Sequence, residues 1–315
     1  MKNIITFVLG IVIALPLFAQ RTESDTLQLA DPTIFHYENK FYLYGTGSNR
    51  GFMVYISDDL KSWKLSAKNE GFALKKGDAF GRGGFWAPQV FEYQKKFYMA
   101  YVADEQIAIA TSDSPLGPFT QEKKDSLSTT IKQIDPFIFM DDDGKKYMYH
   151  VRLTKGNRIF VAEMTDDLSA IKPETLTECI SGTDKWENTA NTNWPVTEGP
   201  TIIKYKKVYY LFYSANDFRN TDYAVGYATS SSPMGPWKKY EGNPILVRQM
   251  LGYNGTGHGD FFQKGNQWYY VFHTHYSNSR VGPRKTALIK ASFQKGKPDI
   301  MKLEPKTFSF VIKSK

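Results

Sequence analysis

The chain has 315 residues, of which 41% are hydrophobic and 15% aromatic, with 20 Tyr and 22 Phe. This composition supplies a sizeable core and favours strands over helices. The net charge of +8 comes from lysines scattered along turns without a basic run, which argues against a nucleic-acid partner and favours solubility and protected strand edges. Cys179 is the only cysteine, which excludes an internal disulfide and a cysteine-based metal site.

Residues 1–19 have the pattern of a secretory signal peptide. One early lysine precedes a short apolar stretch, and small residues follow near Ala19, so we expect cleavage near Ala19 or Gln20. A membrane anchor is the alternative, but the apolar stretch is short for a bilayer span and no second stretch follows it. We therefore expect an exported protein, periplasmic or extracellular, without a membrane partner. A short tail is expected at residues 20–27, and a single domain at residues 28–315.

One unit of sequence recurs five times along the rest of the chain. Each unit opens with a polar or otherwise distinctive residue and continues as an apolar strand, a tight turn, an aromatic strand and a third strand. The units open at Asp31, Trp86, Asp135, Glu198 and His258. A period of about fifty to sixty residues with several strands is typical of propeller blades, which bury their faces against one another. The sequence predicts an all-β fold, a five-bladed β-propeller.

Turns and corners support this division into blades. Short polar segments, such as residues 38–40 and 94–96, separate the first two strands of a unit. Residues 141–144, Asp-Asp-Asp-Gly, are predicted to be another such turn, because they lack the alternating ligand spacing of a calcium loop. The segments "TSDSPLGPF" (111–119) and "TSSSPMGPW" (229–237) are near copies, which we assign to the corner between third and fourth strands.

Four of the five opening residues can ionise or bind protons: Asp31, Asp135, Glu198 and His258. The first strand of each propeller blade lines the central channel, so these side chains are expected to hold equivalent positions and to face one another at one mouth. Grouping three carboxyl groups with a histidine costs desolvation and repulsion. A functional site explains that cost better than the alternatives, which are strand-entry caps before proline and, for Glu198, a surface acid.

At these residues the chain resembles glycoside hydrolase family 43, five-bladed propeller enzymes that cut arabinose- and xylose-containing polysaccharides. The resemblance covers nearly all of residues 28–315. It rests on "ADPTIFHYENKFYLYGT", "IDPFIF", "TEGPTIIKYKKVYYLFYSA" and "GTGHGDFF". The invertase-like propellers are the nearest alternative, but they open with Trp-x-Asn-Asp-Pro where this chain has "LQLADP".

The resemblance implies a role for each acid. Asp31 matches the general base, Glu198 the general acid, and Asp135 the third acid, which orients Glu198 and tunes its pKa. Hydrolysis with inversion needs the base and the acid about 6.5–9.5 Å apart, so that a water fits between them. A nearby carboxylate would keep Glu198 protonated near neutral pH, while Asp31, better solvated or hydrogen-bonded, stays ionised.

Two further residues are assigned by the same resemblance. His258 matches a channel histidine that in many members lies near a bound calcium ion or an ordered water. The resemblance implies no required cofactor. It leaves two expectations for the space beside His258, a structural Ca²⁺ in the central channel or an ordered water. Arg284 is the candidate for the family's substrate-binding arginine, although the residues around it depart from the usual pattern.

Aromatic side chains near the openers are candidates for stacking on sugar rings. We assign this role to Trp86, Phe85 and Trp194, with burial between blades as the alternative for the tryptophans. His273 and His275 share one face of a strand, and no neighbouring acid or cysteine completes a metal site, so hydrogen-bonding roles are predicted. Two loops, residues 77–89 and 181–200, are expected to shape access to the site.

The favoured activity is release of α-L-arabinofuranose from a plant polysaccharide or oligosaccharide, by a monomer. A β-xylosidase or endo-1,4-β-xylanase activity is the first alternative, and cleavage of β-galactan is the next. A carbohydrate-binding propeller without catalysis is the alternative from another class of protein, and the three acids argue against it.

Overall fold

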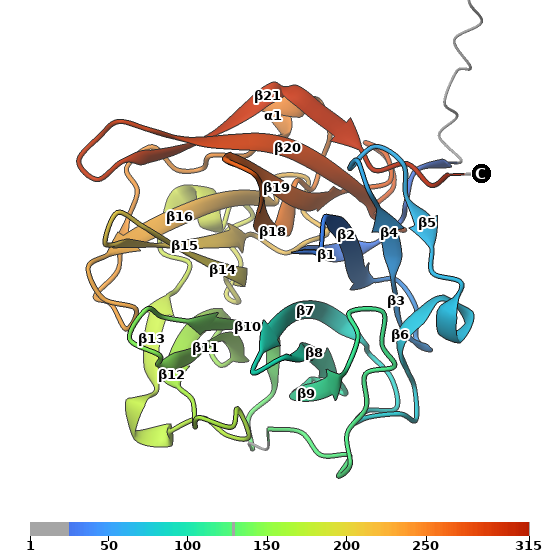
Figure 1. Cartoon of the computed structure of the whole chain (residues 1–315). Helices are drawn as coiled ribbons and strands as arrows, with labels where there is room; N and C mark the ends of the chain where they lie inside the picture. Colours follow the sequence, from blue (N-terminus) through green and yellow to red (C-terminus); the bar gives the residue numbers. More distant parts are fainter. Residues whose placement is uncertain (1–24, 128–129, 315) are drawn as a thin grey trace, which may run out of the picture.

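The computed structural model describes residues 25–127 and 130–314. Five antiparallel sheets surround one axis as blades, which confirms the predicted all-β five-bladed propeller (Figure 1). In each blade the strands follow chain order from the axis outward, so the first strand is innermost. The predicted signal peptide at residues 1–19 lies outside the described residues. Within the described part of the chain, no helix is both long and apolar enough to cross a bilayer.

The strands of the five blades have the following bounds. Blade 1 contains β1 (Ala30–Tyr37), β2 (Lys40–Thr46), β4 (Tyr55–Ser57) and β5 (Lys64–Leu65). Blade 2 contains β7 (Trp86–Tyr93), β8 (Lys96–Ala103) and β9 (Gln106–Ser112). Blade 3 contains β10 (Gln133–Met140), β11 (Lys146–Leu153), β12 (Asn157–Glu163) and β13 (Thr177–Ile180). Blade 4 contains β14 (Thr197–Tyr205), β15 (Val208–Ala215), β16 (Ala224–Ser230) and β17 (Lys238–Lys239). Blade 5 contains β18 (Gly257–Lys264), β19 (Gln267–Thr274), β20 (Lys285–Gln294) and β21 (Ile300–Phe310).

Short elements connect the blades. A two-stranded sheet of β3 (Gly51–Met53) and β6 (Phe72–Lys75) lies beside blade 1. The described helices are single turns: η2 (Lys68–Gly71), η3 (Pro173–Thr175), η4 (Lys185–Glu187) and α1 (Arg248–Leu251).

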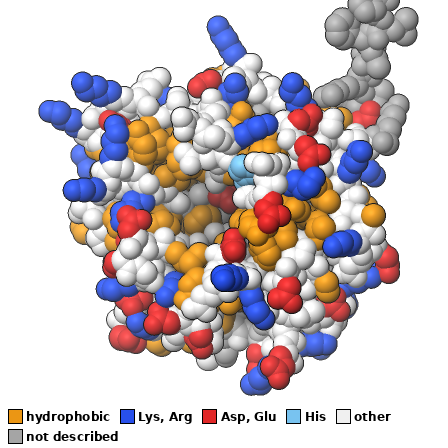
Figure 2. All heavy atoms as spheres, in the orientation of Figure 1, with side chains coloured by type: hydrophobic (Ala, Val, Ile, Leu, Met, Phe, Trp, Pro, Cys, Tyr) orange, Lys and Arg blue, Asp and Glu red, His pale blue; other side chains and the backbone are white. Residues whose placement is uncertain are grey.

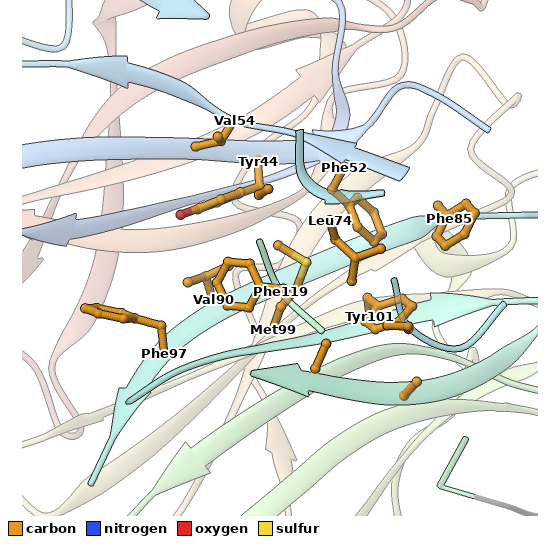
Figure 3. Close-up of a cluster of buried hydrophobic side chains, with 14 of the residues drawn as sticks. Tyr44, Phe52, Val54, Leu74, Phe85, Val90, Phe97, Met99, Tyr101 and Phe119 are labelled. Atoms are coloured by element: carbon orange, nitrogen blue, oxygen red, sulfur yellow. The ribbon is translucent and has the colours of Figure 1, made fainter. Parts of the chain in front are cut away.

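Both faces of every blade are buried, and this explains the nearly continuous apolar strands in the sequence. In β2, Phe41 and Leu43 belong to the hydrophobic cluster between blades 5 and 1. The alternating residues Tyr42 and Tyr44 belong to the cluster between blades 1 and 2, part of which is shown in Figure 3. The three remaining interfaces have clusters of the same kind, so the core is a ring of five blade-to-blade layers.

Tight turns between the first two strands of a blade follow the prediction. Glu38 and Asn39 connect β1 to β2, and both have positive φ, as do Lys206 and Lys207 between β14 and β15. Positive φ at both central residues matches the right-handed twist of the strands, although it costs energy for residues other than glycine. The buried strands on either side fix the register and outweigh this cost.

The ring closes where the two ends of the described chain meet. The Leu27 N–H donates to the Val311 carbonyl at 2.8 Å, and the Thr286 N–H donates to the Leu27 carbonyl at 2.9 Å. Beyond β21 the chain continues to blade 1, where the Trp63 N–H donates to the Ile312 carbonyl at 3.1 Å. The boundary predicted at residue 28 is therefore too late, because Leu27 is buried and already part of the propeller.

Candidate active site

A β-bulge interrupts the innermost strand of every blade near one mouth of the channel. In each strand the pairing gains one residue over its partner. The bulged residue has positive φ in all five blades: Asp31, Ala87, Asp135, Gly199 and His258. Bulges redirect side chains and are frequent beside active sites. Here they turn the start of each inner strand toward the mouth of the channel.

The prediction that Asp31, Asp135, Glu198 and His258 hold equivalent positions is correct for three of the four. Asp31, Asp135 and His258 do occupy the same position, but Glu198 lies one residue before the bulged Gly199, and Trp86 likewise precedes Ala87. Gly199 has φ of 59°, and a Cβ there would come within 2.8 Å of the His258 ring. Because no side chain fits at residue 199, the acid of blade 4 stands at the preceding position.

A cavity of about 410 Å³ occupies this mouth. Figure 2 shows the corresponding hollow near the centre of one face, with acidic side chains inside it. The cavity is lined by Asp31, Trp86, Ile134, Asp135, Asn157, Trp194, Val196, Glu198, Asp217, Phe218, Arg219, His258 and Arg284. The structure thus brings seven of the eight predicted site residues to one cavity.

Asp31 is buried among donors of hydrogen bonds. Its Oδ1 accepts from Arg284 Nη1 at 3.0 Å and lies 3.3 Å from His258 Nδ1. Its Oδ2 accepts from Thr46 Oγ1 at 2.7 Å. Burial alone would raise the pKa of Asp31, but Arg284, the two neighbouring histidines and Thr46 together hold that pKa below its ordinary value. Asp31 is therefore ionised at neutral pH.

Glu198 is buried in a different environment. Its Oε1 accepts from the Tyr223 hydroxyl at 2.8 Å, and its Oε2 accepts from Asn157 Nδ2 at 3.0 Å. Burial raises the pKa of Glu198 to about 7, with a further contribution from the charge of Asp31, although the two donors oppose the shift. A substantial fraction of Glu198 therefore carries a proton at neutral pH.

Asp135 is buried at the same cavity as these two acids. Its Oδ2 accepts from the Gly199 N–H at 3.1 Å and lies 3.8 Å from His258 Nδ1. Burial, followed by the charges of Glu198 and Asp31, raises the pKa of Asp135 well above its ordinary value. Because the charge of Glu198 contributes to this rise, a proton on Glu198 favours ionisation of Asp135.

The histidines have the hydrogen-bonding roles predicted for them. His273 Nε2 lies 3.1 Å from Arg284 Nη1, and His275 Nε2 lies 2.8 Å from the Phe218 carbonyl. Burial lowers the pKa of both His273 and His275, so both rings are neutral. Arg284 also stacks on Phe218, with its guanidinium carbon 4.5 Å from the ring centroid. These contacts fix Arg284 against Asp31.

The aromatic candidates divide into two groups. Trp86 and Trp194 line the cavity and are 37% and 48% exposed, so both rings are accessible there. Phe85 does not, and its assignment to substrate binding is wrong. It is 1% exposed and packs between Phe52 and Tyr101 in the cluster between blades 1 and 2 (Figure 3). Adjacent residues of an extended segment point in opposite directions, so only one of Phe85 and Trp86 can face the cavity.

The donor set around His258 does not fit a calcium ion held by side chains. Among the described residues no group of three or more His, Cys, Asp or Glu side chains is arranged to hold a metal. His258 Nδ1 instead faces Asp31 and Asp135, and burial lowers the pKa of His258. A neutral imidazole can donate one hydrogen bond from Nδ1, and Asp31 Oδ1 at 3.3 Å is the nearer of the two acceptors.

Several residues of the site escaped the sequence reasoning. Thr46, Asn157 and Tyr223 contact the acids, but they lie at the ends of second or third strands, where no motif distinguishes them. Phe218 and Arg219 belong to the loop that follows β15 and reach the cavity from blade 4.

Comparisons with known proteins agree with this geometry. The sequence profile described as Glycosyl hydrolases family 43 matches residues 26–298. A Xylosidase/arabinosidase of Bacteroides ovatus is 26% identical, over 78% of this chain and 85% of that protein. An Arabinoxylan arabinofuranohydrolase of Bacillus subtilis is 28% identical, over 78% of this chain but 55% of that protein. The solved structure of an Endo-1,4-beta-xylanase from Bacteroides thetaiotaomicron has a TM-score of 0.85 and 45% identity, covering 92% of this chain and 98% of that one.

Proposed function

The chain belongs to the glycosyl hydrolases of family 43 and is a glycosidase, and we propose that it releases α-L-arabinofuranose from arabinose-decorated plant polysaccharides with inversion. In this proposal Asp31 is the general base, Glu198 the general acid and Asp135 the residue that tunes the pKa of Glu198. The observation that carries it is the contrast between the surroundings of two buried carboxyl groups in one cavity, a guanidinium at Asp31 and only neutral hydrogen-bond donors at Glu198. Asp31 is held ionised by Arg284, while burial raises the pKa of Glu198 to about 7.

These two states are what inverting hydrolysis requires. The ionised Asp31 accepts a proton from a water as that water attacks the anomeric carbon. On the opposite side of the sugar, Glu198 gives its proton to the glycosidic oxygen as the bond to carbon breaks. The products are the free sugar with inverted configuration and the polysaccharide without that side group. Asp31 then returns its proton to solvent and Glu198 regains one.

Neighbouring groups keep the two acids in their roles. Burial and the charge of Glu198 raise the pKa of Asp135, and like charges disfavour each other's ionised forms, so a proton on Asp135 and a proton on Glu198 are linked. Arg284 offsets the charge of Asp31, and the neutral His258 ring lies beside it, with Nδ1 3.3 Å from Asp31 Oδ1. Trp86 and Trp194 supply exposed rings on which the apolar faces of sugar rings can stack.

The choice of sugar rests on two relatives. The Xylosidase/arabinosidase and the Arabinoxylan arabinofuranohydrolase both carry arabinose in their names. A second candidate function, endo-1,4-β-xylanase, is favoured by the xylanase structure, whose 45% identity is higher than that of either arabinose-named relative. Export to the periplasm or the outside of the cell, where such polymers would be met, stays a prediction.

A panel of substrates tests the proposal. Wild-type protein and Glu198→Ala are given aryl α-L-arabinofuranoside, β-D-xyloside and β-D-galactoside, with arabinoxylan and linear xylan beside them. We expect cleavage of the arabinofuranoside and release of arabinose from arabinoxylan, both lost in the variant. Shortening of linear xylan without arabinose release would replace the first candidate by the second. Retained binding of arabinoxylan with no cleavage of any substrate would instead indicate a binding propeller.

A further inference from the structure

Asn157 connects the proposed general acid to an exposed aromatic ring. It opens β12 in blade 3, whereas Glu198 lies on β14 in blade 4. Asn157 Nδ2 donates to Glu198 Oε2 at 3.0 Å. At the other end of the same amide, Trp194 Nε1 donates to Asn157 Oδ1 at 3.0 Å. An indole, an amide and a carboxyl group therefore form one continuous chain of hydrogen bonds at the wall of the cavity.

The indole fixes which way the amide points. The N–H of tryptophan can only donate, so the amide atom that faces it must be the oxygen. The NH₂ group is then directed at Glu198, where it can only donate. Without the indole, the amide of Asn157 could rotate and present its oxygen to Glu198. Trp194 thus determines whether Glu198 meets a donor or an acceptor.

The backbone holds Asn157 against the segment that leads into Glu198. The Asn157 N–H donates to the Pro195 carbonyl at 3.0 Å, and Thr197 Oγ1 donates to the Asn157 carbonyl at 3.1 Å. The preceding residue, Gly156, has φ of 123°, and a Cβ there would lie 2.5 Å from the Pro195 carbonyl oxygen. This close approach requires glycine and leaves the Asn157 side chain little freedom of position.

The contact affects the chemistry of the acid as well as its orientation. A donor facing a carboxyl group stabilises the ionised form. Asn157 and Tyr223 therefore lower the pKa of Glu198, against the burial and the charge of Asp31 that raise it. Tyr223 occupies Oε1 and Asn157 occupies Oε2, so each oxygen of the acid has one fixed partner.

We propose, resting on the function proposed above, that Asn157 is a positioning residue for the general acid Glu198 and that Trp194 holds Asn157 in the required amide orientation. The ring of Trp194 is 48% exposed at the cavity. A sugar stacked on that ring is linked through one amide to the acid that protonates the leaving oxygen. Trp194 in this way serves both to bind substrate and to prepare the acid.

The chain of hydrogen bonds from Trp194 through Asn157 to Glu198 is called the relay below. Direct titration of Glu198 tests this relay without measuring enzyme activity. Protein carrying ¹³C at the glutamate carboxyl carbons is titrated by NMR, and the Glu198 signal is identified by its absence in Glu198→Gln. In Asn157→Ala the loss of a donor should raise the pKa of Glu198 by about one unit. Asn157→Asp, which keeps an acceptor for the indole but faces Glu198 with a second carboxylate, should raise it further.

Substitutions at the two tryptophans separate the relay from general effects at the cavity. Trp194→Phe keeps an aromatic ring but removes the N–H, so the pKa of Glu198 should rise, by less than in Asn157→Ala. Trp86→Phe is the matched control, because Trp86 lines the same cavity but lies on blade 2, and it should leave the Glu198 titration in place. Asn157→Asp is nearly isosteric and keeps the test valid if Asn157→Ala does not fold.

The outcomes distinguish this proposal from the proposed function. An unchanged pKa of Glu198 in both Asn157→Asp and Trp194→Phe overturns the relay, whatever the enzyme cleaves. The expected shifts support the relay even where the substrate panel gives no cleavage, in which case the proposed function fails alone. A shift of equal size in Trp86→Phe would also overturn it, because the effect would then not depend on the indole–amide bond.

Discussion

The two sides of the cavity treat their carboxyl groups in opposite ways. On the side of blades 1 and 5, Asp31 faces a guanidinium and two imidazoles, and its pKa is held low. On the side of blades 3 and 4, Glu198 faces an amide and a phenol, which are neutral donors, and its pKa rises to about 7. Both acids are buried, so burial alone does not separate them. The difference lies in whether the donors carry charge.

This comparison explains how one cavity can hold a base and an acid together. A cation compensates the desolvation of a carboxylate, whereas a neutral donor compensates it only in part. The acid therefore keeps its proton and the base loses it, although both lie at the mouth of the same channel. Substitutions that move a donor or a charge from one side should break this asymmetry in predictable ways.

The largest effects are expected from removing the acids themselves. Asp31→Asn and Glu198→Gln should each lower kcat/KM by about 1,000-fold on a natural glycoside, because each removes a proton transfer. The two variants should differ on a dinitrophenyl glycoside, whose leaving group needs no protonation. Glu198→Gln should recover most of its rate there, and Asp31→Asn should not.

Leaving-group dependence therefore assigns the roles. Circular dichroism and thermal melting of both variants would verify that the propeller is intact. Recovery in Asp31→Asn but not in Glu198→Gln would exchange the two roles. An equal loss of kcat/KM in both variants on both substrates would contradict the assignment of separate base and acid roles.

Removing the cation should have the next largest effect. In Arg284→Met, Asp31 keeps its burial but loses the first of the charges that lower its pKa. The pKa of Asp31 should then rise by roughly one to three units, so activity is lost at a higher pH on the acid side of the profile. The measurement is the pH dependence of kcat/KM between about pH 3 and pH 9.

A second arginine at the same cavity provides the control. Arg219 also lines the cavity, but it pairs with Asp217 and does not contact Asp31 among the described interactions. Arg219→Met should leave the acid side of the profile where it is in wild type. An acid limb that moves equally in both variants would mean that net charge, rather than the Arg284–Asp31 contact, keeps the base ionised.

The sequence predicted the blades and most of the cavity because both depend on local patterns that repeat. The strands, the turns and the residue that opens each unit recur five times, so each repeat strengthens the assignment of the others. The bulge was not predictable in this way. Gly199 and Ala87 occupy the bulged position that Asp31 occupies elsewhere, and residue type alone does not indicate that they are equivalent.

The partners of the acids were hidden for a different reason. Asn157 contacts Glu198 because blades 3 and 4 pack side by side. Tyr223 contacts it because the third strand of blade 4, β16, begins at the same end of the blade as β14. Such contacts are set by three-dimensional packing and leave no spacing in the sequence. Phe85 was misassigned for a related reason, since its neighbour Trp86 faces the cavity while Phe85 fills an interface between blades.

The smallest expected effect concerns the phenol on the acid side. Tyr223 donates to Glu198 Oε1, and this bond lowers the pKa of Glu198. In Tyr223→Phe that pKa should therefore rise above about 7, by roughly one unit. Because the acid must be protonated to act, the alkaline side of the kcat/KM profile should move to higher pH by the same amount.

A buried tyrosine elsewhere in blade 4 makes the matched control for this last variant. Tyr213 donates to Glu187 Oε1 at 2.6 Å, away from the cavity lining. Tyr213→Phe removes a buried tyrosine–carboxylate bond of the same kind, so its cost in thermal stability should be comparable, yet its alkaline limb should stay at the wild-type pH. A limb that moves in Tyr213→Phe, or that moves downward in Tyr223→Phe, would show that neutral donors do not set the protonation of Glu198. A movement confined to Tyr223→Phe and directed upward would show that Tyr223, a neutral donor, helps to set the protonation of Glu198 on the side of the cavity formed by blades 3 and 4.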